Sequence, residues 1–370
     1  MMSVNHNLEP LRRSGIRLYT NLAREVGGCV MLTLGEPDFP TPAPIRQAAV
    51  DALANNMTHY APNQGLPQLV QAIAQRESVL PQQVLVTVGA TGALYTALTG
   101  ILNPGDEVIV PYPAYSLYDT IITAAGARTV RLDTRPSGFQ ITPQALRPLL
   151  SPRTKAIVVN SPNNPTGTVY NAASLAAVRQ AALERELYVI CDNVYDRLVY
   201  GEYPDLSRDP ALREQLLLCQ SFSKPWAMTG WRAGYLVGPE RLMERLLIFH
   251  AAQVTAVPTF VQAACVQALQ TDITPMLAEY ARRRDYCVER LEKMGLSCPR
   301  PEGAFYLFVD ISGWGLSSDE FCTRLIRQAK VATVPGSCFG DDGFLRISYC
   351  CAMEQLRLGL DRLEQFLQTL

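Results

Sequence analysis

Histidine and lysine are scarce in this chain of 370 residues. A zinc site or a serine–histidine–aspartate triad would have to draw on only three histidines, which disfavours both kinds of site and predicts no bound metal. These histidines are His6, His59 and His250. Only four basic residues are lysines, namely Lys155, Lys224, Lys293 and Lys330. A reaction that needs a lysine amine therefore has few candidates.

Long runs of like charge and the common glycine signatures for nucleotides are also missing. The formal net charge is −1, with no block of one sign, so nothing indicates a nucleic-acid partner or an anionic membrane surface. The chain has no Gly-x-Gly-x-x-Gly and no Gly-Lys-Ser/Thr, which argues against dinucleotide-binding and P-loop classes.

The cysteines favour a cytoplasmic protein, and one long uncharged segment is better explained by buried helices than by a membrane span. Ten cysteines are scattered without a Cys-x-x-Cys, and a chain of this length needs no disulfides, so we expect reduced thiols. The N-terminus lacks the pattern of a signal peptide. Residues 246–271 carry no Lys, Arg, Asp or Glu, but they contain His250 and Pro258. Two buried helices that join near Val257-Pro258 are favoured over a membrane span.

From residue 84 to residue 237, short β-rich runs alternate with longer amphipathic runs. This alternation predicts an α/β fold with a three-layer, doubly wound, mostly parallel sheet. The predicted strands are 84–88, 107–110, 129–132, 156–159, 187–191, 216–219 and 233–237, and the clearest helices are 91–102 and 172–186.

After residue 240 the pattern changes to long helices with a few short strands. Helices are expected at 274–294, 318–328 and from 353 onward, with strands at 304–309 and 344–349. This predicts a smaller α+β domain over residues 274–370, after a large α/β domain at 35–273. We expect residues 1–34 to form an arm that packs with the small domain or with a partner subunit.

Ligands of doubly wound sheets bind beyond the carboxyl ends of the strands, so the residues just after the strands are the first place to look for chemistry. The segments selected in this way are 89–91, 112–115, 160–167, 192–195 and 221–224.

Lys224 and Asp192 are the strongest chemical candidates in these segments. Lys224 directly follows an apolar strand, where desolvation would lower its amine pKa and favour Schiff-base chemistry. The alternative is a surface lysine, which the flanking hydroxyls and the downstream Arg232 disfavour. Asp192 ends a buried strand, and a carboxylate there needs a partner such as a pyridinium nitrogen, although in isolation a helix N-cap is the better explanation.

Two further features are weaker by themselves. Gly89-Ala90-Thr91 opens a helix after a strand, and the free N–H groups there suit a phosphate, although this turn is common. Arg346 lies inside an apolar run, where an arginine usually pairs with a planar anion. A substrate carboxylate and a structural Asp or Glu remain open as that anion.

Several short stretches, in their order and spacing, resemble one known family across essentially the whole chain. The stretches are Ser14-Gly15-Ile16-Arg17, Gly35-Glu36-Pro37-Asp38-Phe39, Thr58-His59-Tyr60, Asn160 to Gly167, Asp192 to Tyr195, Ser221 to Lys224, Met228 to Arg232, Gly303 to Tyr306 and Arg346 to Tyr349. The chain resembles the fold-type-I, class I/II aminotransferases, of the aspartate- and aromatic-aminotransferase kind. The resemblance implies pyridoxal 5′-phosphate as cofactor, amino acids and 2-oxo acids as substrates, and a homodimer with shared active sites.

The resemblance also implies a role for each matching residue. Lys224 carries the cofactor and then shuttles a proton, while Asp192 pairs with the pyridine nitrogen. Tyr195 and Asn164 bond the phenolic oxygen, and Tyr115 stacks on the ring in preference to Tyr112. The phosphate contacts fall on Ala90, Thr91, Ser221, Ser223 and Arg232, with Tyr60 reaching across from the neighbouring subunit. The substrate contacts fall on Arg346, Gly35 and Asn164.

Substrate choice and reaction type stay open at this stage. Asn193 stands where relatives often have Glu, Pro225-Trp226 follows Lys224, and no second arginine for a side-chain carboxylate is evident. An aromatic or other neutral amino donor is slightly favoured. The alternatives are a β-lyase or an amino-acid oxidase or cyclase on the same fold, or a ligand-sensing module. The chain leaves no room for the DNA-binding domain of such a sensor, and the retained Lys224 argues against it.

Overall fold

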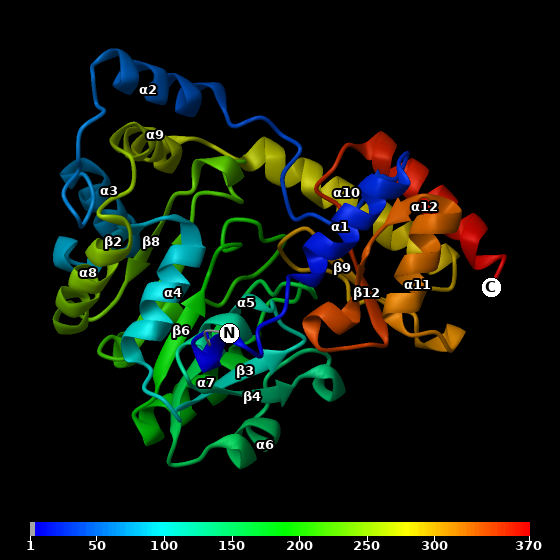
Figure 1. Ribbon diagram of the computed structural model, residues 1–370, viewed down its shortest axis with the longest axis horizontal. Helices are drawn as coiled ribbons and strands as arrows, with labels where there is room; N and C mark the ends of the chain where they lie inside the picture. Colours follow the sequence, from blue (N-terminus) through cyan, green and yellow to red (C-terminus); the bar gives the residue numbers. More distant parts are fainter. Residues whose placement is uncertain (1–3) are drawn as a thin grey trace.

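The chain folds around a seven-stranded sheet, as the computed structural model of residues 4–370 shows (Figure 1). The strand order is β2-β8-β7-β6-β5-β3-β4, and every pair is parallel except the two that involve β8. The strands are β2 (Val84–Thr87), β3 (Glu107–Tyr112), β4 (Arg128–Asp133), β5 (Thr154–Asn160), β6 (Tyr188–Asp192), β7 (Leu216–Ser221) and β8 (Gly234–Val237). The predicted mostly parallel sheet is confirmed.

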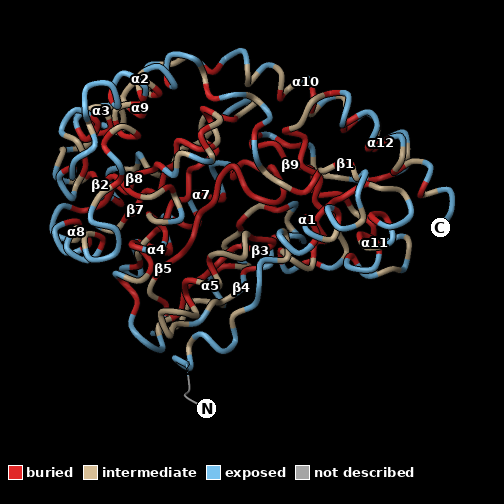
Figure 2. The backbone as a smooth tube through the Cα atoms, turned by 45° about the horizontal axis from the view of Figure 1, so that its top comes forward, coloured by how far each residue is buried: buried red, intermediate tan, exposed pale blue. Residues whose placement is uncertain are grey.

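Successive side chains along the central strands enter two different cores, one on each face of the sheet. Ile157 and Val159 of β5 belong to one core, whereas Ala156 and Val158 belong to the other. Because both faces of the sheet are covered, the central strands are apolar at every position. The sheet is therefore the middle one of three layers. The covering helices include α4 (Gly89–Ile101), α5 (Leu117–Ala124), α6 (Pro143–Leu146), α7 (Ala172–Arg185), α8 (Glu240–Val254) and α9 (Thr259–Gln270). Figure 2 shows the buried strands inside a rim of exposed helix surface.

Of the two helices on either side of Pro258, α8 (before the proline) is less buried than expected. Helices α8 and α9 end and begin around Val257-Pro258 as predicted. On α8, however, Ile248 is 65% exposed and Phe249 is 37% exposed, so this helix presents an apolar strip to the outside. No helix in the described part of the chain is both long enough and apolar enough to cross a membrane.

A smaller α+β part follows, and the N-terminal segment pairs with it. Its three-stranded antiparallel sheet has the order β11-β12-β9, and β1 pairs with β10 in parallel. The strands are β1 (Val30–Met31), β9 (Tyr306–Asp310), β10 (Val331–Ala332), β11 (Val334–Pro335) and β12 (Phe344–Ser348). The remaining helices are α1 (Gly15–Val26), α2 (Ala43–Ala54), α3 (Pro67–Glu77), α10 (Thr274–Lys293), α11 (Ser318–Arg324) and α12 (Met353–Leu367). Helix α1 contacts β10 and β11, which places an N-terminal helix against the C-terminal part of the chain. Residues 1–3 of the predicted arm lie outside the described residues.

Candidate active site

A cavity of about 620 Å³ lies where the carboxyl ends of the parallel strands meet the smaller sheet. All five segments that follow the predicted strands contribute to its lining, together with residues from the N-terminal segment and from β9 and β12. Of the residues singled out from the sequence, the lining includes Gly35, Ala90, Thr91, Tyr115, Asn164, Asp192, Tyr195, Ser221, Ser223, Lys224, Arg232 and Arg346. Tyr60 is absent from this lining and is 91% exposed, and Tyr112 lies outside the cavity.

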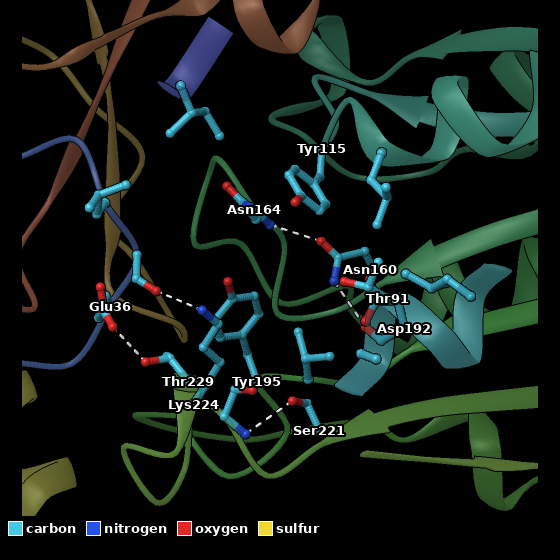
Figure 3. A pocket seen from close by; sticks show the side chains of 18 of the residues that line it. Glu36, Thr91, Tyr115, Asn160, Asn164, Asp192, Tyr195, Ser221, Lys224 and Thr229 are labelled. Atoms are coloured by element: carbon cyan, nitrogen blue, oxygen red, sulfur yellow. Dashed lines mark hydrogen bonds between the residues drawn. The ribbon is translucent and has the colours of Figure 1, made fainter. Parts of the chain in front are cut away.

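Lys224 points into the middle of this cavity (Figure 3). Its Nζ donates a hydrogen bond to the backbone oxygen of Gly35, at 2.6 Å. Burial lowers the pKa of Lys224 to about 8, and the neighbouring Cys350 and Glu36 only partly oppose that effect. A larger fraction of this amine is therefore neutral, and hence nucleophilic, near physiological pH than for a surface lysine.

Asp192 ends β6 on the side of the cavity toward α5. It is 4% exposed, and its Oδ2 accepts a hydrogen bond from the hydroxyl of Tyr118 at 2.6 Å. Burial raises the pKa of Asp192 to about 6, although the Tyr118 hydroxyl, the Val194 N–H and the Lys224 charge act against the rise. The other oxygen, Oδ1, is buried without a hydrogen-bond partner among the described residues. A cationic N–H placed there would satisfy this oxygen and stabilise the carboxylate.

The first turn of α4 and the side chain of Arg232 form a cradle for an anion. Gly89 has a φ of +67°, and a Cβ at this position would lie 2.8 Å from Nη2 of Arg232. Arg232 also donates from Nη1 to the backbone oxygen of Thr229, at 2.9 Å, which orients its guanidinium group. Because the first N–H groups of a helix lack intrahelical acceptors, this turn and the arginine together suit a phosphate.

Arg346 projects from β12 into the opposite side of the cavity. Its Nη1 donates to Oδ1 of Asn164 at 2.8 Å, and its Nη2 donates to the backbone oxygen of Thr33 at 2.6 Å. The guanidinium group lies 4.3 Å from the ring centre of Tyr306, and the residue is 1% exposed. Its Nε is buried and has no partner in the part of the chain that the structure describes. A fixed arginine with a free donor is suited to a carboxylate.

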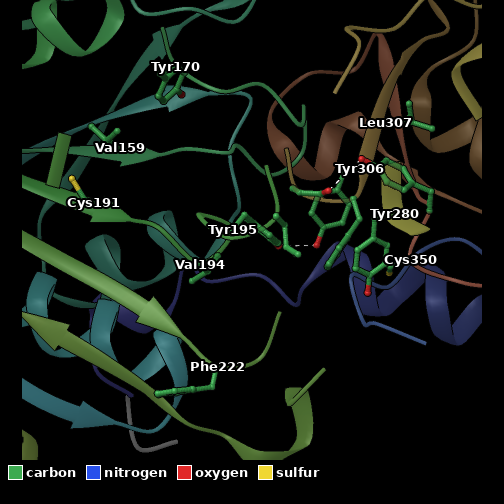
Figure 4. Close-up of a cluster of buried hydrophobic side chains, with 14 of the residues drawn as sticks. Val159, Tyr170, Cys191, Val194, Tyr195, Phe222, Tyr280, Tyr306, Leu307 and Cys350 are labelled. Atoms are coloured by element: carbon green, nitrogen blue, oxygen red, sulfur yellow. Dashed lines mark hydrogen bonds between the residues drawn. The ribbon is translucent and has the colours of Figure 1, made fainter. Parts of the chain in front are cut away.

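Tyr195 and Tyr306 connect the two sheets at the floor of the cavity. Their hydroxyl oxygens lie 2.9 Å apart, and the rings pack edge to face (Figure 4). Burial raises the pKa of Tyr195 well above its usual value, so this hydroxyl stays protonated and can donate a hydrogen bond. Tyr115 also lines the cavity and packs edge to face on Tyr118, with ring centres 6.2 Å apart.

Five lining residues of chemical interest had no role in the sequence-based interpretation: Arg17, Glu36, Tyr118, Thr229 and Tyr306. Tyr118 was overlooked because the helix over 117–124 was not predicted, and only that helix turns its hydroxyl toward Asp192. Glu36 accepts a hydrogen bond from the Thr229 hydroxyl at 2.6 Å, which joins the N-terminal segment to the loop after β7. Arg17 belongs to the Ser14-to-Arg17 stretch that carries part of the family resemblance, and this was the one sequence feature that could have pointed to it.

Comparisons with known proteins agree with this geometry. The family model described as aminotransferase class I and II matches residues 28–363. The aromatic-amino-acid aminotransferase 2 of Thermococcus litoralis is 36% identical, and the alignment covers 99% of each chain. A probable N-acetyl-LL-diaminopimelate aminotransferase of Bacillus subtilis is 37% identical over 98% of this chain and 96% of the relative. The solved structure of aspartate aminotransferase from Thermus thermophilus with maleate superimposes with a TM-score of 0.94 at 36% identity, over 99% of this chain and 100% of that chain. The chain therefore belongs to the class I and II aminotransferases.

Proposed function

We propose that this protein binds pyridoxal 5′-phosphate in the cavity and transfers an amino group from an L-amino acid to a 2-oxo acid. The observation that carries the proposal is the placement of three groups in one cavity. These are a lysine amine of lowered pKa, a buried carboxylate with a free oxygen, and a buried arginine with a free Nε. A small amino acid needs all three groups if it is to be bound, oriented and deprotonated in one place.

The residues fit this cofactor. Lys224 would hold it through the amine, and Oδ1 of Asp192 would accept the pyridine N–H. Tyr195 and Asn164 would bond its phenolic oxygen, and Tyr115 would stack on its ring. The phosphate would be held by Ala90, Thr91, Ser221, Ser223 and Arg232. The N–H of Ser223 already donates to the Ser221 hydroxyl oxygen at 3.0 Å, which fixes the two serines relative to each other.

When bound, the cofactor supplies an electron sink that stabilises negative charge at the substrate α-carbon. The side chains of the protein then orient the substrate and move its proton. Arg346 and the Gly35 backbone fix the α-carboxylate and thereby decide which bond at the α-carbon is weakened. The Nζ of Lys224 would take up the α-proton and hold it for return, as a general acid–base catalyst. A lysine whose pKa is about 8 suits both roles near neutral pH.

The same proposal includes an amino donor with an aromatic or other neutral side chain. One support is the aromatic-amino-acid aminotransferase among the relatives. Another is the cavity wall beside α1 and α4, where Ile16, Leu94 and Leu117 are apolar.

The assembly that we propose is a homodimer with shared active sites, in the cytoplasm. Tyr60, 91% exposed on the surface, would complete the phosphate site of the neighbouring subunit. All ten cysteines are free thiols, which suits a reducing compartment. We also propose a large domain at 35–273, a small domain at 274–370, and an arm at 1–34 that packs with the small domain or with the partner. The pairing of β1 with β10 supports this docking of the arm.

The test is a visible absorption spectrum of the purified protein with added cofactor, before and after a panel of single amino acids. We expect a yellow protein whose visible absorption some amino acids abolish, with release of one equivalent of 2-oxo acid. Lys224→Ala should remain colourless, whereas the matched variant Lys155→Ala should stay yellow. Release of ammonia without an acceptor would instead favour a β-lyase or an oxidase. A colourless wild-type protein would refute the assignment of Lys224.

A further inference from the structure

The loop after β7 carries a proposed cofactor contact near each of its ends. Lys224 stands near the beginning of the loop and Arg232 near its end, and both line the cavity. Between them lies a short 3-10 helix, η7 (Thr229–Trp231). Ala227, just before this helix, and Arg232, which ends it, have φ angles of +50° and +55°. The left-handed conformation is unfavourable for a residue with a Cβ atom, so other contacts must hold the loop in this shape.

Thr41 holds this loop from outside the cavity. It lies in the segment between β1 and α2, is 9% exposed and is absent from the cavity lining. Its hydroxyl donates to the backbone oxygen of Ala227 at 2.6 Å and accepts from Nε1 of Trp231 at 3.1 Å. A single hydroxyl, which has only one hydrogen to donate, thus bridges the two sides of η7.

The shape of the loop decides where the guanidinium group of Arg232 lies. Nη1 of this arginine donates to the backbone oxygen of Thr229, which is part of η7. Nη2 lies so close to the first turn of α4 that a Cβ on Gly89 would be 2.8 Å from it. A shift of η7 would therefore move the guanidinium group relative to the N–H groups of that turn, and the cradle for an anion would lose its geometry.

We propose that Thr41 is a positioning residue for the cofactor phosphate, because it bridges Ala227 and Trp231 and thereby holds Arg232 at the first turn of α4. This inference rests on the proposed function, since it concerns the phosphate of the proposed cofactor. Thr41 acts through the loop, because its hydroxyl bonds to the loop at two points. Loss of this hydroxyl should therefore affect a ligand that carries the phosphate and spare the same ligand without it.

The first test compares pyridoxal 5′-phosphate with pyridoxal, which lacks the phosphate. Binding of each ligand to the cofactor-free protein is followed by visible absorption. We expect Thr41→Val to weaken binding of pyridoxal 5′-phosphate about tenfold, the lower end for one charge-assisted hydrogen bond, and to leave the affinity for pyridoxal within about twofold. Thr41→Ser keeps the hydroxyl, so it should bind both ligands within about twofold of the wild-type affinities.

Thr333→Val is the matched control for the loss of a buried threonine hydroxyl. Thr333 is 0% exposed, its hydroxyl oxygen lies 3.2 Å from Sγ of Cys322, and it is absent from the cavity lining. This substitution should change neither affinity. Equal losses for the two ligands in Thr41→Val, or no loss for either, would overturn the role of Thr41 in phosphate binding.

A double-mutant cycle tests the bridge itself. Trp231→Phe removes the N–H that donates to Thr41, and it should weaken binding of pyridoxal 5′-phosphate about threefold. In the double variant Thr41→Val has already broken the bridge, so Trp231→Phe should add no further loss. Losses that multiply would overturn the bridge.

Failure of this inference is distinguishable from failure of the proposed function. A wild-type protein that binds neither pyridoxal 5′-phosphate nor pyridoxal would overturn the proposed function, and this inference with it. A wild-type protein that binds both, with variants that do not discriminate between the two ligands, would overturn the role of Thr41 alone.

Discussion

The lysine in the cavity should destabilise the cofactor-free protein, and Lys224→Met measures this cost. The pKa of Lys224 is about 8 in the folded protein, against 10.5 for an unperturbed lysine. At about 1.4 kcal/mol per pH unit, burial of this ammonium group costs about 3 kcal/mol at pH 7. Methionine removes the charge but leaves the Gly35 oxygen without its donor, which costs about 1 kcal/mol. The variant should therefore be more stable than the wild type by about 2 kcal/mol, or about 3 °C in Tm for a chain of this length.

The pH dependence of stability distinguishes the removal of a buried charge from a simple improvement in packing by the methionine side chain. The unfolded lysine keeps its proton up to a pH near 10.5, and the folded one only up to about 8. The penalty is therefore full below pH 8 and is lost as the pH rises through 10.5. At pH 10 only about 1 kcal/mol remains, and the lost Gly35 bond cancels it, so the two proteins should be equally stable.

The assay is urea unfolding of cofactor-free protein at pH 7 and pH 10, followed by fluorescence at one fixed protein concentration. Lys293→Met is the control, because Lys293 is 63% exposed and pairs with Glu289 on the surface. It should show no comparable change between the two pH values. The reasoning would be refuted if Lys224→Met were less stable than the wild type at pH 7. It would also be refuted if the variant exceeded the wild type in stability by the same amount at pH 7 and pH 10.

Two other substitutions test the support around the site. Tyr118→Phe removes the hydroxyl that donates to Asp192 at 2.6 Å, so the pKa of Asp192 should rise further, and the acid limb of cofactor binding should move up by about one pH unit. An unchanged acid limb in a titration of cofactor affinity would contradict this. Gly35→Ala places a Cβ 1.8 Å from the Tyr306 hydroxyl oxygen, so the segment that bonds the lysine must move, and kcat should fall at least about tenfold. Gly230→Ala, with no atom within 4 Å of the new Cβ, should retain full activity.

The sequence was sufficient to predict the sheet and most of the cavity, because a single rule connects them. Asp192 and Lys224 each follow an apolar strand, and in a parallel sheet such positions meet at one edge. Contacts that depend on how separate elements dock were not predictable in this way. The hydroxyl of Tyr118 reaches Asp192 only because α5 packs where it does. The place of Arg17 in the cavity lining is equally unpredictable until α1 is placed on the cavity wall.

The sequence was least informative about very short strands and about which apolar side chains of a helix are exposed. β1 and β10 have two residues each, too few for a periodic pattern, and they pair across about 300 positions of the chain. The apolar stretch of α8 predicted a buried helix, yet Ile248 is 65% exposed. Hydrophobicity alone does not distinguish a residue inside the subunit from a residue on an outer apolar strip.

The pairing of the N-terminal segment with the C-terminal part of the chain has a consequence for folding during synthesis. Val30 pairs with Val331, Ser348 donates its N–H to the Leu32 oxygen, and Arg346 donates to the Thr33 oxygen. None of these bonds can form until nearly the whole polypeptide has left the ribosome. The large sheet can assemble first, because its last strand ends at residue 237. The cavity must therefore close last, and a nascent chain truncated before residue 331 would hold Lys224 in an open, incomplete cleft.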